Sequence, residues 1–255
     1  MLKNNPFHYS IATRIRNSYF IKYLTPNPND NILEVGCGVG YFCQLLYKYG
    51  PKIYGVDVSS ESIEYCKRNI DGDFTIGDAE SLDYEDHYFE KVLCTEVLEH
   101  VEDDKKALKE MYRVLKPNGS LVMTIPTQDG IFGAKIKNIM HSHGEGPSKH
   151  EREGYSKKEI IELFESVGFK VDKIRYTMVF FTEIFMGITK IVYSIKTKDD
   201  HLDSQSEVQE VSNSLLFKIL KIIFPVFLLI SKLDDIFLHK ILKGHMIVLR
   251  GIKSE

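Results

Sequence analysis

The feature that most constrains the fold is a short apolar run that leads directly into three closely spaced glycines. Residues 32–35 read Ile-Leu-Glu-Val, and Gly36, Gly38 and Gly40 follow before a helical pattern begins at Tyr41. Because glycine has no Cβ atom, a strand that ends in such a turn can bring its backbone close to a ligand. A strand, a glycine turn and a helix in this order predict the first unit of an α/β sheet.

Strand and helix patterns then alternate along most of the chain. The expected strands are residues 32–35, 53–58, 74–76, 91–94, 120–125, 169–176 and 245–250. The expected helices are residues 7–24, 41–49, 61–70, 103–115, 156–167, 178–196 and 214–242. This alternation predicts an α/β fold, a Rossmann-like, seven-stranded, mostly parallel sheet flanked by helices, with a helical insertion before the last strand. Ligands of such sheets bind beyond the carboxyl ends of the strands.

The expected domain organisation follows from where the alternation weakens. Residues 1–177 form the expected core, which begins with the helix at 7–24. Residues 178–243 form an apolar helical insertion that contains a polar, mobile segment at 198–212. Residues 244–255 return to the core sheet as its closing strand.

The composition favours a folded protein and excludes several classes of function. Hydrophobic residues make up 43% of the chain and charged residues 27%, as in ordinary globular proteins. The formal net charge of -3 argues against general nucleic-acid binding, which needs a basic face. None of the four cysteines forms a C-x-x-C pair, which argues against a zinc site and fits a reducing cytoplasm. No uninterrupted apolar run reaches about 18 residues, so we expect a cytoplasmic protein, with peripheral contact at the inner face of the membrane as a second expectation.

Acidic residues accompany the glycine turn. Glu34 precedes it, and Asp57 ends the next expected strand, 17 residues beyond Gly40. A carboxylate at that place can accept hydrogen bonds from both hydroxyls of a ribose. Asp78 follows the third strand, in the sequence Gly-Asp-Ala-Glu. Position 41 is Tyr, whereas a dinucleotide fingerprint needs Gly there, so the spacing favours S-adenosylmethionine (SAM) over NAD.

Residues 34–40, Glu-Val-Gly-Cys-Gly-Val-Gly, resemble motif I of the class I SAM-dependent methyltransferases, of the ubiquinone-biosynthesis type or methyltransferase-11-like. The resemblance covers residues 7–177 and includes the Leu-Lys-Pro-Asn-Gly-Ser turn at 115–120. It implies that the glycine turn packs against the methionine part of SAM, that Glu34 helps to anchor the amino group and that Asp78 contacts the adenine amino group. The cofactor-binding residues expected on this basis are Glu34, Gly36, Cys37, Gly38, Gly40, Asp57, Val58, Asp78, Ala79 and Thr95.

The end of the fourth expected strand carries the candidate catalytic residues. Glu96, Glu99 and His100 stand at i, i+3 and i+4, positions that share one face of a helical turn. The pattern resembles that of ubiquinone-biosynthesis O-methyltransferases and of small-RNA 2′-O-methyltransferases. This resemblance implies a divalent cation such as Mg²⁺, which would activate a hydroxyl. The alternative is a metal-free active-site wall in which His100 is the general base.

The loop-rich stretch after the fifth expected strand, residues 128–154, contains His141, His143 and His150. Because it follows the carboxyl end of a strand, it belongs to the expected rim of the active site. Two interpretations stay open, contact with the substrate or a metal, and a polar surface lid.

Residues 214–242 are strongly apolar. Lys218 and Lys221 interrupt the run, and Pro225 would kink a helix. The segment can lie in a membrane interface with its lysines toward the headgroups, cover a hydrophobic substrate pocket, or pack as a buried helix or homodimer face. The apolar residues expected to join it around such a pocket are Phe180, Phe181, Ile184 and Phe185.

These features predict a SAM-dependent methyltransferase that methylates an oxygen of a small hydrophobic or lipid-linked acceptor. Oxygen is favoured by the cluster of Glu96, Glu99 and His100, because a hydroxyl must lose its proton. The alternatives are C- or N-methylation of a small molecule without metal, and a non-catalytic, membrane-associated SAM-binding scaffold. An RNA acceptor is disfavoured by the lack of surplus positive charge.

Overall fold

The computed structural model describes residues 11–127, 129, 154–182 and 215–254, and the chain divides into two compact units. The described parts of the core unit are residues 17–127, 154–175 and 247–254. The described parts of the second unit are residues 11–16, 129, 176–182 and 215–246. The described chain passes between the units at 16/17, between 127 and 129, between 129 and 154, at 175/176 and at 246/247, whereas the sequence predicted boundaries at 177/178 and 243/244 alone.

Several expectations fall outside the described residues. They concern the beginning of the first helix at 7–10, most of the helix at 178–196, the segment at 198–212, and His141, His143, His150, Ile184 and Phe185.

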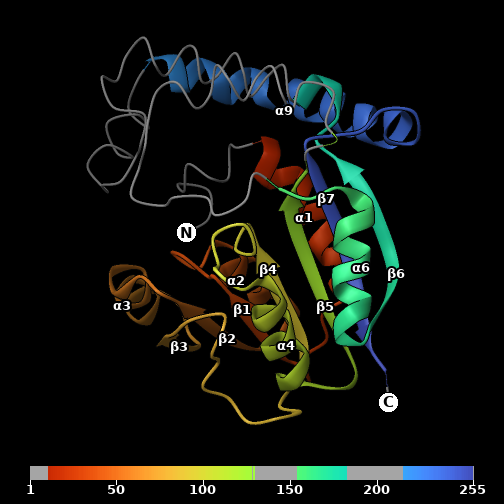
Figure 1. Cartoon of the computed structure of the whole chain (residues 1–255). Coiled ribbons are helices and arrows are strands. Elements are labelled where there is room, and N and C mark those ends of the chain that lie inside the picture. Colours follow the sequence, from red (N-terminus) through yellow and green to blue (C-terminus); the bar gives the residue numbers. More distant parts are fainter. Residues whose placement is uncertain (1–10, 128, 130–153, 183–214, 255) are drawn as a thin grey trace. The chain divides into compact units, whose positions relative to one another are not determined.

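Seven strands form one sheet in the order β3-β2-β1-β4-β5-β7-β6 (Figure 1). The strands are β1 (Asn31–Val35), β2 (Lys52–Asp57), β3 (Asp73–Ile76), β4 (Phe89–Thr95), β5 (Leu115–Pro126), β6 (Phe169–Thr177) and β7 (Met246–Lys253). β1 to β5 pair in parallel and β7 runs antiparallel, which confirms the predicted Rossmann-like sheet. The carboxyl ends of β1 to β5 therefore share one edge of the sheet, the carboxyl edge, and their amino ends share the opposite amino edge.

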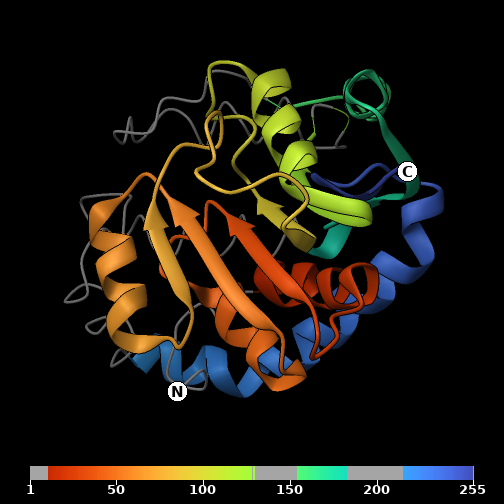
Figure 2. The ribbon, with the colours of Figure 1, turned by 90° about the horizontal axis from the view of Figure 1, so that it is seen from below.

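The helices of the core unit cover both faces of this sheet. They are α1 (Ile11–Leu24), which belongs to this unit from residue 17, and α2 (Tyr41–Leu46), α3 (Ser60–Asn69), α4 (Asp104–Val114) and α6 (Lys157–Val167), with a 3-10 turn at Tyr47–Tyr49. The second unit contains α9 (Leu215–Phe237) and a 3-10 turn at Leu238–Lys240. In the core unit, α1 from residue 17, α2 and α3 lie on one face, and α4 and α6 on the other (Figure 2). Phe20 of α1 packs edge-on against Phe42 of α2, with ring centroids 4.9 Å apart. Buried apolar side chains of the central strands fill the space between these layers.

Local sequence signals determine where several helices begin and end. Ser59 and Asp103 are the N-caps of α3 and α4, and each side chain accepts a hydrogen bond from a backbone N–H three residues on. Ser156 and Glu159 form a reciprocal capping box at the start of α6, and Gly168, with φ of +110°, ends that helix. The sequence predicted these helices at 61–70, 103–115 and 156–167, within one residue of the observed bounds of α3, α4 and α6.

Strand β5 begins earlier than predicted. The Pro-Asn-Gly turn at 117–119 was expected to precede the strand, but it lies within the strand, which starts at Leu115. Leu115 pairs with Phe89, and the next partner pair is Ser120 with Lys91, so the chain bulges between them. Asn118 has φ of +63° in this bulge, a conformation that asparagine tolerates.

In the second unit, two aspartates of α9 bind the end of β6 and the segment that follows it. Asp235 Oδ1 accepts hydrogen bonds from Thr177 Oγ1 at 2.8 Å and from Met178 N at 2.9 Å. Asp234 Oδ2 accepts one from Phe181 N at 2.9 Å. Both aspartates are buried, so the acidic pair of this helix faces inward. None of the helices in the described ranges has the length and apolar character needed to cross a membrane.

Candidate active site

The glycine turn lies at the carboxyl edge of the sheet, between β1 and α2. Gly36, Gly38 and Gly40 all have positive φ, of +71°, +48° and +69°. The N–H groups of Gly36 and Cys37 both donate to Val56 O of β2, at 2.8 and 3.1 Å. The neighbouring strand therefore holds the turn, and the predicted strand–turn–helix unit is confirmed.

The space around the turn differs between its glycines. A Cβ atom at Gly36 would overlap Val97 Cγ2, which belongs to the loop after β4. A Cβ atom at Gly38 would meet no heavy atom within 4 Å. Gly36 therefore packs the turn against that loop, while Gly38 borders open space through which a ligand can approach the backbone.

Asp57, the last residue of β2, holds the turn through its carboxylate. Its Oδ2 accepts a hydrogen bond from Gly38 N at 2.7 Å, and its Oδ1 accepts one from Ser59 N at 2.9 Å. A carboxylate has about four lone-pair sites, so these two bonds leave capacity for the hydroxyls of a diol. The structure places Asp57 beside the glycine turn, and its binding to ribose stays a prediction.

Glu34, the acid before the turn, is buried in β1 with 2% of its surface exposed. Its Oε2 accepts hydrogen bonds from Cys43 N at 3.0 Å and from Cys43 Sγ at 2.8 Å. Burial raises the pKa of Glu34 to about 8, so the carboxyl is protonated at neutral pH while no cation lies beside it. An approaching ammonium group would favour the ionised form, as the predicted role toward the amino group of SAM requires.

The cysteine of the turn is packed as a neutral thiol. Cys37 Sγ and Cys66 Sγ both contact Gly38 O, at 3.7 and 3.2 Å. Its hydrogen bond with Cys66, together with burial, raises the pKa of the Cys37 thiol. Cys37 can therefore serve a cofactor through its backbone rather than as a thiolate.

The segment after β3 lies next to the end of β2, because Asp57 pairs with Ile76 in the parallel ladder. Asp78 is exposed, and its Oδ1 accepts a hydrogen bond from the backbone N–H two residues on, at 2.9 Å, while Ala79 is buried. Val58 and Ile76 are 73% and 60% exposed. Exposed apolar side chains beside a polar loop suit a flat heterocycle such as adenine. Ile76 was not among the predicted cofactor residues.

The chain reverses direction where β4 ends at Thr95. Glu96 has φ of +51°, and its N–H donates to Thr124 O at 3.1 Å. His100 N donates to Val97 O at 2.9 Å, so this stretch forms an irregular turn rather than helix. Glu96, Glu99 and His100 therefore do not share one face of a helical turn, as their spacing had predicted.

The three candidate catalytic residues in this turn differ in their exposure to solvent. Glu99 is 1% exposed, whereas Glu96 is exposed and His100 is half-buried. Within the described part of the chain, no three His, Cys, Asp or Glu side chains are grouped as a metal ion requires. The structure therefore does not bring Glu96, Glu99 and His100 together as metal ligands.

Side chains that were not predicted hold the loops of this edge in place. Glu80 Oε1 accepts hydrogen bonds from Glu102 N at 2.9 Å and from Asp103 N at 3.0 Å, which ties the loop after β3 to the start of α4. Tyr155 donates to Asp104 Oδ2 at 2.8 Å. These partners lie 22, 23 and 51 residues apart in sequence, so no local pattern could have indicated them.

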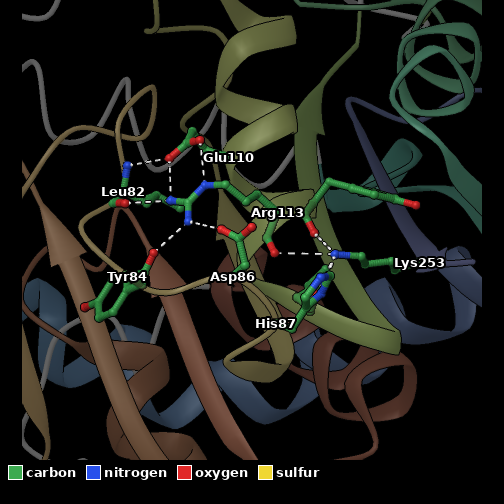
Figure 3. Close-up of polar contacts among 9 residues, drawn as sticks. Leu82, Tyr84, Asp86, His87, Glu110, Arg113 and Lys253 are labelled. Carbon is green, nitrogen blue, oxygen red and sulfur yellow. Dashed lines mark hydrogen bonds and ion pairs between the residues drawn. The ribbon is translucent and has the colours of Figure 1, made fainter. Parts of the chain in front are cut away.

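A second polar cluster lies at the amino edge of the sheet, around Arg113 at the end of α4 (Figure 3). Its guanidinium donates to Leu82 O at 2.8 Å and to Tyr84 O at 2.7 Å. It also pairs with Glu110 and Asp86, each at 2.8 Å. The hydrogen bond to Glu110 raises the pKa of Arg113, so the cation is held firmly among these acceptors.

Lys253, at the end of β7, completes this amino-edge cluster (Figure 3). Its Nζ donates to Tyr112 O and Leu115 O, each at 2.7 Å, and lies 3.1 Å from His87 Nδ1. Burial lowers the pKa of Lys253. Backbone carbonyls satisfy the ammonium group here, which is the arrangement of a structural cation.

The fold and the carboxyl edge together define a class of protein. A sheet in the order 3-2-1-4-5-7-6, with a glycine turn after β1 and an acid at the end of β2, is that of a class I SAM-dependent methyltransferase. Residues 33–123 match a family model described as a methyltransferase domain. The chain is 34% identical over 160 residues to the uncharacterized protein MJ1123 of Methanocaldococcus jannaschii, covering 62% of this chain and 72% of that protein. The chain belongs to the class I SAM-dependent methyltransferase family, and SAM is its cosubstrate.

A further relative and a solved structure of the same fold are named for different acceptors. The chain is 30% identical over 124 residues to a ubiquinone biosynthesis O-methyltransferase of Coxiella burnetii, covering 47% of this chain and 52% of that enzyme. The chain thus spans about half the length of that relative. A phosphoethanolamine N-methyltransferase of Haemonchus contortus, solved in complex with SAM, superposes with a TM-score of 0.62 at 19% identity, covering 94% of this chain and 52% of that one. This second likeness shows the fold alone.

Proposed function

We propose that this methyltransferase transfers the methyl group of SAM to an oxygen of a small hydrophobic or lipid-linked acceptor, with His100 as the general base. The observation that carries the proposal is the packing of Val97 against Gly36. Gly36 opens the turn that is expected to hold the methionine part of SAM. The loop at 96–100 therefore lies beside the place expected for the reactive methyl group.

The residues of the carboxyl edge fit each part of SAM. Open space beside Gly38 lets the methionine part approach the backbone. The buried carboxyl of Glu34, just before the turn, is expected to meet the amino group, and Asp57 keeps acceptor capacity for the ribose. Val58 offers an exposed apolar surface to the adenine ring, and Asp78 an exposed carboxylate. SAM, when bound here, supplies an electrophilic methyl group on a sulfonium.

His100 has the exposure that a general base needs. It is half-buried, so an acceptor can reach the imidazole while the surroundings still limit access of water. The acceptor oxygen attacks the methyl carbon in line with the C–S bond; the O–C bond forms, the C–S bond breaks, and the hydroxyl proton passes to an imidazole nitrogen of His100. In this proposal Glu99, which is buried, is a positioning residue, and Glu96, which is exposed, contacts the acceptor.

Two observations support an oxygen acceptor with apolar character. The Coxiella burnetii relative is named for O-methylation in ubiquinone biosynthesis. Helix α9 of this chain exposes a series of large apolar side chains, which suits a protein that meets lipid-like molecules. N-methylation is the competing outcome, because an amine nitrogen can attack the same methyl group with its lone pair before it loses a proton.

The experiment is methyl transfer from radiolabelled SAM to three probes, octylcatechol, octylaniline and catechol. The first two differ in the attacking atom, and the first and third differ in the alkyl chain. We expect product from octylcatechol, less from catechol and little from octylaniline, with full activity in excess chelator. Transfer to octylaniline alone would refute the oxygen assignment, and a preference for catechol would refute the apolar one.

The base is tested with variants of the loop after β4. His100→Ala and His100→Gln should each lower kcat by roughly a hundredfold or more, with little change in KM for SAM. Glu102→Gln, at an exposed residue two positions further on, is the matched control and should leave kcat unchanged. Full kcat in His100→Ala would show that another group takes the proton.

A further inference from the structure

We infer that helix α9 binds along the surface of a membrane with anionic headgroups, with its exposed apolar face in the boundary between headgroups and acyl chains. This inference goes beyond methyl transfer and does not depend on the identity of the acceptor. It rests on the burial and charge of residues in the second unit alone.

The side chains of α9 divide into two faces by their burial. Large apolar side chains that are 37% to 78% exposed are Ile222, Val226, Leu229, Ile230, Leu233, Ile236, Phe237 and, just beyond the helix, Ile241. At about 100° per residue, those within the helix fall on an arc of about 120°. The buried residues of the opposite face are Phe224, Leu228, Ser231, Asp234 and Asp235. A helix that keeps its acids inside and its large apolar residues outside is the reverse of an ordinary surface helix.

The charges of this segment favour an anionic surface. Residues 215–243 contain five lysines and two aspartates. Asp234 and Asp235 are buried and accept hydrogen bonds from the end of β6 and the segment after it. Lys232 and Lys240 are exposed. Among the described side chains of this segment, the exposed ones are therefore apolar or positively charged, and the acids are directed inward.

The arrangement fits a helix that lies on a membrane rather than one that crosses it. The buried face carries two aspartates, and no described helix meets the length and apolar character of a span. An apolar face bordered by lysines is the pattern of interfacial helices. A second copy of this chain is the other candidate occupant, but it would bring two lysine-bearing faces together, and like charges oppose such pairing.

The experiment is vesicle flotation with the full chain. Vesicles of phosphatidylcholine alone are compared with vesicles of phosphatidylcholine and phosphatidylglycerol in equal parts. We expect the protein to float with the anionic vesicles, to float far less with the neutral ones, and to dissociate at high salt. Leu229→Glu together with Leu233→Glu should lower the bound fraction by at least about tenfold, because both side chains leave the apolar contact. Both residues are exposed, so the variant should keep the wild-type Tm.

The matched control changes the net charge by the same amount elsewhere. Lys67→Gln together with Lys170→Gln removes two positive charges at exposed positions on α3 and β6, and should float as the wild type does. The inference is overturned if the wild type does not float with anionic vesicles, if it floats equally with neutral ones, or if the glutamate variant floats undiminished. Light scattering that shows a wild-type dimer, a monomeric glutamate variant and no flotation would assign the face to a second copy of this chain.

Discussion

The two edges of the sheet use charged side chains in opposite ways. At the carboxyl edge, acids accept hydrogen bonds from backbone N–H groups, as Asp57 does from Gly38 and Ser59. At the amino edge, cations donate to backbone carbonyls, as Arg113 does to Leu82 and Tyr84. Both clusters consist of partly buried charges that bind the main chain, so the presence of charge alone does not reveal which edge is the active site.

The difference lies in how much hydrogen-bonding capacity remains. The guanidinium of Arg113 has five N–H donors, and its bonds to Glu110, Asp86, Leu82 and Tyr84 use all of them. The carboxylate of Asp57 accepts two bonds in the core unit and has about four lone-pair sites. A saturated cluster stabilises the fold, whereas one with spare acceptors beside open space can bind a ligand.

The largest effect expected concerns Glu34. The pKa of Glu34 is about 8 in the folded protein, whereas its ordinary value is 4.5. Between these two pH values, the native state keeps a proton that the unfolded state has released. The contribution of Glu34 to stability is therefore full below about pH 4.5, falls as pH rises from about 4.5 to about 8, and is lost above that, a change on the order of 5 kcal/mol. Urea unfolding across this range should show the fall in the wild type and a flat profile in Glu34→Gln.

Glu64→Gln is the control, because Glu64 is exposed and pairs only at the surface with Arg68. It should follow the wild-type profile. Parallel profiles for the wild type and Glu34→Gln would refute the buried, neutral state of Glu34. Saturating SAM should flatten the wild-type profile, because its ammonium group would favour the ionised carboxylate.

The second prediction contrasts two glycines of the turn. Gly36→Ala should lower the free energy of unfolding by about 3 kcal/mol, because the left-handed backbone is strained and the new Cβ overlaps Val97. Gly38→Ala carries only the backbone strain and should lower it by about 1 kcal/mol. Denaturant melts measure both, and adding Val97→Ala should recover part of the loss in Gly36→Ala. Equal losses in the two single variants would show that Val97 does not fill the space above Gly36.

Features that depend on neighbouring residues were predictable from the sequence. The glycine turn and the helix predicted at 156–167 each arise from a few adjacent residues, and the structure confirms both. The start of β5 was mispredicted because that prediction, too, used only neighbouring residues. The Pro-Asn-Gly turn at 117–119 was taken as a boundary, whereas pairing with β4 continues on both sides of it.

Features that join distant residues could not be predicted in this way. Lys253 reaches Leu115 O across 138 residues, and Asp235 reaches Thr177 across 58. The geometry expected for Glu96, Glu99 and His100 was wrong, because their spacing was read as one face of a helical turn, while the positive φ of Glu96 makes the stretch an irregular turn. Sequence spacing reveals a shared face only where the backbone is regular.

The third prediction concerns Asp57 as a ligand-binding residue. Asp57→Ala should weaken SAM binding by roughly a hundredfold, because a charged acceptor of two hydroxyls is lost and the hydrogen bond that orients Gly38 is lost with it. Calorimetry with SAM measures the change. Asp71→Ala, at an exposed residue that bonds Tyr47, is the control and should bind SAM as the wild type does. Unchanged affinity in Asp57→Ala would mean that the carboxylate serves only the turn.

The smallest effect expected is at the amino edge, where Arg113→Met should lower the free energy of unfolding by about 2 kcal/mol. This figure allows for the partial exposure of the side chain, 30%, and reflects the loss of both carbonyl contacts and the Glu110 pair. Arg113→Lys keeps the charge but cannot supply five donors, so it should recover less than half of this loss. Asp86→Asn, at a side chain that is 63% exposed, should cost under about 0.5 kcal/mol.

All three variants should bind SAM with wild-type affinity once folded. Weaker SAM binding in Arg113→Lys would break the division between a structural amino edge and a ligand-binding carboxyl edge, because it would show that the two are coupled through the sheet.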